Sequence, residues 1–426
     1  PLSQRDEEGI LFVYSAALSY YRKISFFYGI GVLSLSLICP FIIKTHVSFF
    51  TVFWVTLLEG MSGVVTFSYI QTPSVLFDSD GKGYINNAIG LGNRIIGYAI
   101  KILLAFWNVN IIYLQLAYFI INIVKIFIYK VFLNRYYPWI TPQKNRNASI
   151  LKDKNSYVLT EIAWTIFSST DMIVLSIFVS TELSSVYSIY NMIYSNVYAL
   201  LNAVTTSLLF VLGQSYQKDI KKYKNVHDSF TSIILGIITI LMSVSYVLTV
   251  PFVNLYTEGV ADINYIYTSL PIMFCLVQML SWSRYVNGNL TALAGYAKQT
   301  SYISLVEAAI NVVMSIILVQ RFGIVGVLFA TVSAMPIKVI WCAYVADKKV
   351  LHRSAFKSFF IISSNFLFFF SVVVISKFCE LVILSYIEFV IWGIVLTVIL
   401  GAANLGMNIL INKQCWLIVK KFIWKE

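Results

Sequence analysis

Long apolar stretches alternate with short polar gaps along the whole chain. A helix needs about 20 apolar residues to cross the hydrocarbon core of a bilayer. Lipid offers no partner to open backbone groups, so stretches of this kind form helices or barrel strands. These stretches are too long and too continuous for barrel strands. The pattern therefore predicts an all-α, polytopic membrane protein with about 12 transmembrane helices.

The predicted spans are Ile24–Ile43, Val47–Tyr69, Ala88–Trp107, Ile111–Tyr129, Tyr157–Val179, Val186–Leu212, Phe230–Tyr256, Tyr265–Val286, Tyr302–Val319, Ile324–Val345, Phe359–Ser376 and Phe389–Ile411. Basic residues concentrate in every second gap between these spans. The basic gaps and the tail hold Lys130, Arg135, Lys144, Arg146, Lys152, Lys154, Lys218, Lys221, Lys222, Lys224, Lys348, Lys349, Arg353, Lys357, Lys413, Lys420, Lys421 and Lys425. The other gaps hold Lys44, Arg321 and Lys377, with acids such as Glu182, Glu258 and Asp262. The positive-inside rule places the basic gaps and the C-terminus in the cytoplasm.

Composition agrees with a membrane protein. Apolar residues make up 59% of the 426 residues, against about 45–50% in soluble domains. A net charge of +12 would suggest nucleic acid as a partner of a soluble protein. Here the topology explains the basic loops, so we expect lipid headgroups and no nucleic acid as partners. The five cysteines are scattered without a CxxC pair, which indicates neither a zinc site nor a disulfide framework.

The gaps predict five segments. Residues 1–23 form a cytoplasmic loop with a short interfacial helix, and residues 24–130 form a first bundle of four spans. Residues 131–156 are a cytoplasmic inter-bundle loop. Residues 157–346 form a second bundle of six spans, and residues 347–426 add two spans and a basic tail. A chain that opens on a loop suggests missing upstream sequence. No gap accommodates a soluble catalytic domain, so we expect a transporter rather than an enzyme.

Charges inside the spans are costly and usually face a cavity or a partner. Arg94 and Lys101 are seven residues apart on one predicted helix, hence on roughly one face. Lys338 lies within another span. A cavity lined by such cations suits an anionic substrate, phosphate or pyrophosphate especially. The alternative is that these side chains snorkel to the headgroups.

A polar stripe marks one predicted helix of the second bundle. The stripe consists of Ser304, Glu307, Asn311 and Ser315, spaced so that they share a face. Asp171 and Thr331, on two other spans, could complete a seat for Na⁺ or for a proton. The alternative is a structural network of hydrogen bonds between helices. The sequence contains no hydrolase triad, HExxH motif or phosphate loop, and it predicts no cofactor beyond this monovalent ion.

Four segments resemble Wzx-type polysaccharide flippases in order and spacing. They are Pro1–Ile10 (PLSQRDEEGI), Val186–Gln214 (VYSIYNMIYSNVYALL…VLGQ), Pro251–Tyr265 (PFVNLYTEGVADINY) and Ala294–Met335 (AGYAKQT…VEAAINVVMSIILV…FGIVGVLFATVSAM). That family belongs to the multidrug/oligosaccharidyl-lipid/polysaccharide exporter superfamily. The resemblance implies two six-helix bundles facing a central cavity, with two further helices at the C-terminus. It also implies that the chain is N-terminally truncated by two spans of about fourteen.

The resemblance implies alternating-access flipping of an undecaprenyl-pyrophosphate-linked oligosaccharide across the bacterial inner membrane, for capsule or O-antigen. A polysaccharide polymerase and a chain-length regulator would be its partners. Some superfamily members hold a cation among the first, fifth and sixth helices of the second bundle. In this chain those helices carry Asp171, Glu307 with Asn311, and Thr331. Two alternatives stay open, namely a membrane-embedded polymerase or ligase and a drug or ion exporter of the same superfamily.

Overall fold

The computed structural model describes residues 6–43, 45, 47–141, 154–218, 220–260, 263–379 and 381–412. Every regular element in these ranges is helical. Contacts divide the chain into two compact units, Pro1–Lys152 and Asp153–Glu426. The boundary falls within the predicted loop 131–156. Several residues used to orient the chain, including Lys44, Lys144, Arg146, Lys152, Asp262 and the tail 413–426, lie outside the described residues, as do residues 1–5 of the first motif.

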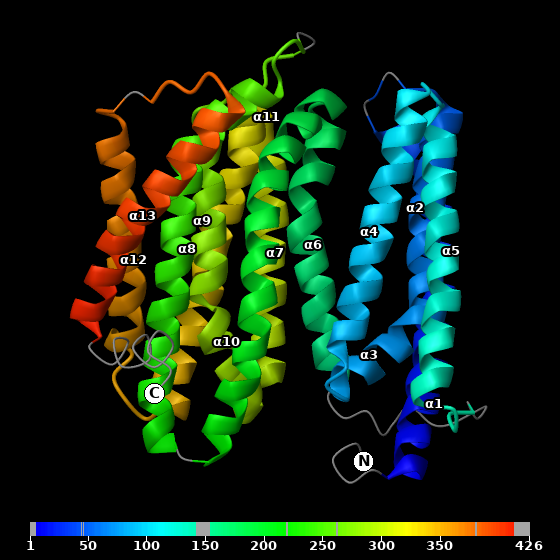
Figure 1. Ribbon diagram of the computed structural model, residues 1–426, viewed down its shortest axis with the longest axis horizontal. Helices are drawn as coiled ribbons and strands as arrows, with labels where there is room; N and C mark the ends of the chain where they lie inside the picture. The colour runs from blue at the N-terminus through cyan, green and yellow to red at the C-terminus, as the bar shows by residue number, and fades with distance from the viewer. Residues whose placement is uncertain are drawn as a thin grey trace. The chain divides into compact units, whose positions relative to one another are not determined.

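The first unit contains the helices drawn in blue to cyan in Figure 1. They are α1 (Glu7–Ile42), α2 (Phe49–Val65), the π-helical turn Thr66–Ile70, α3 (Gln71–Ser79), α4 (Gly83–Phe106) and α5 (Ile111–Tyr136). The second unit contains α6 (Lys154–Phe178), α7 (Thr181–Lys218), α8 (Ile220–Tyr256), α9 (Leu270–Ser283), α10 (Tyr285–Thr291), the π-helical turn Ala292–Tyr296, α11 (Ala297–Tyr344), the π-helical turn Val345–Val350, α12 (Phe356–Ser376) and α13 (Tyr386–Ile411).

Length and apolarity mark these helices as membrane spans. Among the described residues, eight helical runs are long and apolar enough to cross a membrane. This number counts runs rather than passes, because one run covers the 81 residues from Leu270 to Val350 and includes a reversal of the chain. Phe106 and Leu410 are 83% and 82% exposed, as expected for side chains that face lipid. The prediction of an all-α polytopic membrane protein is confirmed.

The reversal lies at Gly323, where α11 folds back as a hairpin. Gly323 has φ 54° and ψ −133°, a conformation that side chains with a Cβ rarely adopt. At Gly326 an added Cβ would lie 2.4 Å from the carbonyl oxygen of Leu318, so the returning helix needs a glycine there. The short gap predicted between the spans that end at Val319 and begin at Ile324 is therefore a tight turn in the structure.

One predicted segment differs from the structure. Residues 7–23, expected as a loop with a separate interfacial helix, form the first turns of α1, which continues to Ile42. Asp6 caps this helix by accepting a hydrogen bond from the Gly9 amide at 3.0 Å. The segment from Glu7 to Lys23 contains no proline, and its one glycine, Gly9, lies in the first turn, so nothing separates this segment from the first span. Polarity was mistaken for a break in the helix.

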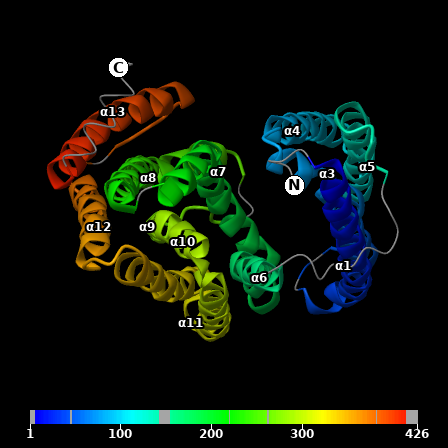
Figure 2. The same cartoon turned by 90° about the horizontal axis from the view of Figure 1, so that it is seen from below.

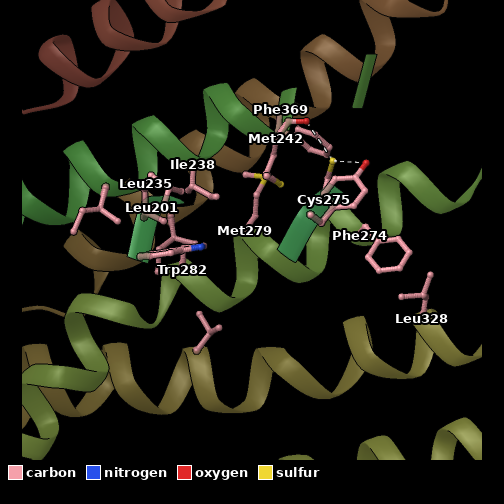
Figure 3. Packing of buried hydrophobic residues seen from close by; sticks show 14 of the residues in the cluster. Leu201, Leu235, Ile238, Met242, Phe274, Cys275, Met279, Trp282, Leu328 and Phe369 are labelled. Carbon is pink, nitrogen blue, oxygen red and sulfur yellow. Dashed lines mark hydrogen bonds between the residues drawn. The ribbon is translucent and has the colours of Figure 1, made fainter. Parts of the chain in front are cut away.

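In the second unit a hydrophobic core holds α7, α8, α9 and α11 together. Trp282, Phe274 and Met279 of α9 are at most 2% exposed. In Figure 3, Trp282 lies beside Leu201 of α7, Met279 lies beside Met242 of α8, and Phe274 lies toward Leu328 of α11. α12 and α13 pack on α8 at the edge of this unit, as Figure 2 shows from below. The π-helical turns Ala292–Tyr296 and Val345–Val350 and the hairpin at Gly323 interrupt the helices around this core.

Polar contacts fasten α12 and α13 to this core at two places. The first is an asparagine cluster, in which Asn404 and Asn408 of α13 bond to Asn365 of α12. Gly236 of α8 leaves room for it, since a Cβ there would lie 3.0 Å from Oδ1 of Asn404. Small residues and amide side chains are the usual means of close helix packing in lipid.

The second fastening is a charge cluster between the ends of α8, α11 and α12. Arg353 donates to both carboxylate oxygens of Asp228 at 2.6 and 2.8 Å and to Asp347 at 2.7 Å. Burial disfavours the charged form of Arg353, but the hydrogen bonds to the two carboxylates outweigh it and raise the pKa of Arg353. Arg353, which the sequence marked only as a basic residue of a cytoplasmic gap, thus also links Asp228 to Asp347 through charge-assisted hydrogen bonds.

Candidate functional site

A lone carboxylate, Asp171 of α6, is surrounded by hydroxyl groups inside the second unit. Thr331 of α11 donates toward its two oxygens at 2.9 and 3.0 Å, and Tyr187 of α7 donates at 3.1 Å. Asn311, on the other arm of the α11 hairpin, donates to the Thr331 hydroxyl at 2.7 Å. Asp171 is 3% exposed and Asn311 0%. We call Asp171, Tyr187, Asn311 and Thr331 the carboxylate cluster.

The carboxylate cluster has unused acceptors. The side-chain oxygen of Asn311 and the hydroxyl of Ser315, one turn further along α11, are buried without a hydrogen-bond partner among the described residues. Buried polar atoms usually have a partner, so an orphan suggests a missing ligand or water. Carboxylate, amide and hydroxyl oxygens together fit a small cation, and a lone carboxylate also fits a proton.

A second group of charged side chains lies in the same unit. Arg284, between α9 and α10, donates through Nη1 to Oε1 of Glu307. Nζ of Lys338 lies 4.0 Å from the other oxygen of Glu307. The Arg284 guanidinium also lies over the ring of Trp164, 5.7 Å from its centroid, within the range of a cation–π contact. We call Arg284, Glu307 and Lys338 the cationic cluster, since two cations and one anion leave a formal charge of +1.

Each cluster borders a cavity within the second unit. One cavity, of about 270 Å³, is lined by Arg284 and Lys338. The other, of about 220 Å³, is lined by Asp171, Tyr187 and Thr331. Three side chains line both cavities, and they are Trp164, Tyr198 and Ser281. The two clusters of opposite formal charge therefore lie on neighbouring cavities with common walls.

No protein-family model and no curated protein matches the sequence. In three dimensions the chain is similar to the lipid II flippase MurJ in an inward closed conformation. The TM-score is 0.60 at 15% sequence identity, and the match covers 94% of this chain and 85% of that one. The chain has a MurJ-like fold. At this identity the likeness establishes the architecture alone, and the resemblance to Wzx-type flippases stays a prediction.

Within this MurJ-like fold, the predicted substrate cations fall in both units. Arg94 and Lys101 belong to α4 of the first unit. Nζ of Lys101 lies 4.1 Å from the centroid of the Tyr118 ring on α5, while Arg94 is exposed. Lys338 belongs to α11 of the second unit, beside Glu307. Their role as substrate contacts stays a prediction.

Of the predicted ion ligands, the structure brings Asp171, Asn311 and Thr331 together and leaves Glu307 out. Glu307 shares the buried face of α11 with Asn311, but its carboxylate points to Arg284. The reason is electrostatic, because a buried carboxylate is stabilised far more by a cation than by amide and hydroxyl groups. Sequence reasoning passed over Arg284, although an arginine inside the predicted span Tyr265–Val286 was a signal of the same kind as Lys338.

Proposed function

We propose that this chain is a flippase that moves a lipid-linked oligosaccharide across the bacterial inner membrane by alternating access. The cargo would be an undecaprenyl-pyrophosphate-linked repeat unit used for capsule or O-antigen. The MurJ-like fold supports a flippase architecture, and the four motifs that resemble Wzx-type proteins support this class of cargo. Rocking of helical bundles around a midplane site is the general mechanism of such transporters.

The observation that carries the proposal is the cationic cluster on a cavity inside a membrane bundle. Arg284 and Lys338 line that cavity with side chains that are only 8% and 14% exposed. Two cations at such a place are costly, and the single carboxylate of Glu307 leaves one formal positive charge that an anion in the cavity would balance. Guanidinium and ammonium groups bind phosphate through short, charge-assisted hydrogen bonds. A pyrophosphate linkage is the anionic part of the proposed cargo.

The remaining walls of the cavity suit a sugar. Trp164, Tyr198 and Tyr285 present aromatic rings, and Ser281 and Asn289 present hydrogen-bonding groups. Sugars combine apolar faces with hydroxyl edges, so this mixture of aromatic rings and polar groups can bind an uncharged sugar. A site for a cationic drug would instead need an excess of carboxylates.

Coupling to an ion is the second part of the proposal. The carboxylate cluster, with Asp171, Asn311 and Thr331, would bind Na⁺ or a proton in one state of the transporter more tightly than in the other. Only such a difference in affinity allows an ion gradient to drive the conformational change. The two orphaned acceptors on α11 support a ligand at this position.

A flipping assay in proteoliposomes tests the proposal. The full-length protein is reconstituted with a fluorescent undecaprenyl-pyrophosphate oligosaccharide, and a membrane-impermeant quencher reports the fraction that has crossed. Flipping should depend on a Na⁺ or pH gradient and should fall at least about tenfold in Arg284→Gln, because a charge-assisted bond is worth about 1.5–3 kcal/mol. Arg321→Gln, at an exposed position, serves as the matched control.

Lipid II, the substrate named for the structural neighbour, is the second cargo to assay. Preferential flipping of lipid II would replace the polysaccharide cargo by a peptidoglycan precursor and leave the mechanism intact. Equal rates for wild type, Arg284→Gln and empty liposomes with both cargos would refute a flippase function.

A further inference from the structure

Glu307 occupies an unusual position in the cationic cluster. Arg284 and Lys338 line the 270 Å³ cavity, whereas Glu307 does not. Its side chain is 3% exposed; one carboxylate oxygen accepts from Arg284, and the other lies 4.0 Å from Nζ of Lys338. A group in this position does not meet the cargo directly, but it decides how much of the positive charge the cavity offers.

Charge balance shows what Glu307 does when the cavity holds no anion. Two cations buried together in a membrane bundle repel each other and lack water, and each such group costs several kcal/mol. The Glu307 carboxylate offsets this cost by accepting from Nη1 of Arg284 and attracting Lys338. A guanidinium has five N–H donors, so Arg284 keeps donors for an anion that enters from the cavity.

An entering phosphate would compete with Glu307 for the same two cations. A carboxylate carries one negative charge, whereas a pyrophosphate linkage carries two, together with more acceptor oxygens. The bidentate geometry that guanidinium prefers is available on phosphate as well as on carboxylate. Binding of the phosphate therefore weakens the ion pair between Arg284 and Glu307. The free energy lost from that ion pair reduces the net free energy of cargo binding.

We propose that Glu307 is an internal counter-anion that holds Arg284 and Lys338 while the cavity is free of cargo and that competes with the phosphate group of the cargo. The inference rests on the proposed function. It adds a prediction of the direction in which the affinity for cargo changes when Glu307 is removed. Removal of an ordinary binding or coupling residue weakens binding, whereas removal of a competing anion strengthens it. A weaker grip on the cargo would also assist its release after flipping.

A binding measurement with the full-length protein in nanodiscs of neutral lipid tests this direction. The probes are geranylgeranyl pyrophosphate, inorganic pyrophosphate and, as the uncharged reference, geranylgeraniol. In Glu307→Gln, which keeps the shape of the side chain, we expect the pyrophosphate probes to bind about tenfold more tightly than in wild type, a usual size for coupling between two sites. In Arg284→Gln and Lys338→Gln we expect binding to weaken by about tenfold or more.

Two controls separate the counter-anion from other roles. Glu59→Gln removes an intramembrane carboxylate of the first unit that bonds to Gln115, and it should leave the affinity unchanged. If Glu307→Gln folds poorly, Glu307→Asp shortens the reach of the carboxylate and should also tighten binding, by a smaller factor. In nanodiscs of anionic phospholipid, the wild-type protein should bind the probes more weakly only if membrane headgroups enter the same site.

The outcomes distinguish the two levels of the proposal. Tighter binding in Glu307→Gln with weaker binding in Arg284→Gln supports the counter-anion. Weaker binding in Arg284→Gln with unchanged or weaker binding in Glu307→Gln overturns the counter-anion and leaves the phosphate subsite standing. Equal binding of pyrophosphate probes and geranylgeraniol by wild type overturns both.

Discussion

Thr331 is the hydroxyl that joins the two arms of the α11 hairpin to Asp171, so Thr331→Val tests the carboxylate cluster at its centre. Valine keeps the branched shape and removes only the hydroxyl. The substitution deletes the bond to Asp171 and also leaves the Nδ2 of Asn311, which donates to Thr331 at 2.7 Å, without its acceptor. Tyr187 still donates to Asp171 at 3.1 Å.

The loss of stability follows from these contacts. A hydrogen bond to a charged group contributes about 1.5–3 kcal/mol, and an unpaired buried donor costs about 1–3 kcal/mol. Measured couplings inside a membrane protein are smaller, about 0.6 kcal/mol on average. We therefore expect Thr331→Val to lower the free energy of unfolding by about 0.6–3 kcal/mol.

The effect on ion binding is separate and more diagnostic. At a Na⁺ concentration tenfold above Kd, a bound ion stabilises the folded state by about 1.4 kcal/mol. If the loss of one oxygen ligand weakens binding tenfold, that gain falls to about 0.4 kcal/mol. Thermal unfolding of the purified protein in NaCl and in choline chloride measures both gains. A proton site would show the same loss across a pH series instead.

Thr397→Val on α13 is the matched control, because its exposed hydroxyl donates only to the Gly393 carbonyl one turn before it. It should change neither the stability nor the response to ions by more than about 0.5 kcal/mol. If Thr331→Val keeps the wild-type response to both Na⁺ and pH, the carboxylate cluster is a structural network and not an ion site.

Three further outcomes are expected. Arg353→Met leaves the buried Asp347 without its cation, while Asp228 keeps Lys357 at 3.1 Å. The change should therefore cost an amount at the lower end of about 3–5 kcal/mol in thermal or chemical unfolding, whereas the exposed Arg321→Met should cost less than about 0.5 kcal/mol. Equal losses would show that the charge cluster does not stabilise the packing of α12. Gly236→Leu places a side chain against the asparagine cluster, so it should lower the free energy of unfolding by at least about 1–3 kcal/mol and increase proteolysis of the α12–α13 connection. Gly401→Leu, where an added Cβ meets no atom within 4 Å, should have neither effect. Lys101→Ala should block surface polysaccharide in cells that express the full-length gene; normal polymer at normal expression would contradict its role in the cavity.

The sequence was sufficient for the architecture because lipid imposes strict rules on it. Spans of about 20 apolar residues, with only a short gap between Val319 and Ile324, already predicted the helices and the reversal that the structure contains at Gly323. The continuity of α1 was missed for a related reason. Charged residues near Glu7 and Lys23 resemble a loop in hydropathy, but nothing in them stops a helix whose polar part extends beyond the membrane.

Pairing between helices was the part that could not be predicted. Spacing on α11 placed Glu307 and Asn311 on one face, and both are buried there. Spacing cannot reveal that Arg284, 23 residues earlier and at the junction of α9 and α10, pairs with the Glu307 carboxylate. Tyr187 likewise gave no signal among 28 tyrosines. Partners of this kind depend on which helix faces lie together, and that is fixed only by packing.

The separation of Glu307 from Asp171 changes how an ion and an anionic cargo can be coupled. If all four predicted ligands lay in one site, the two carboxylates of Asp171 and Glu307 would hold the cation, and Arg284 and Lys338 would be left without a counter-ion. In the structure each cavity instead carries one sign, negative at Asp171 and positive at Arg284 and Lys338. Because α11 contributes residues to both clusters and the cavities share Trp164, Tyr198 and Ser281, the proposed cation in one and the proposed phosphate in the other would attract each other through a low-dielectric wall. Each then favours the binding of the other, and thermodynamic reciprocity requires the effect to be equal in both directions.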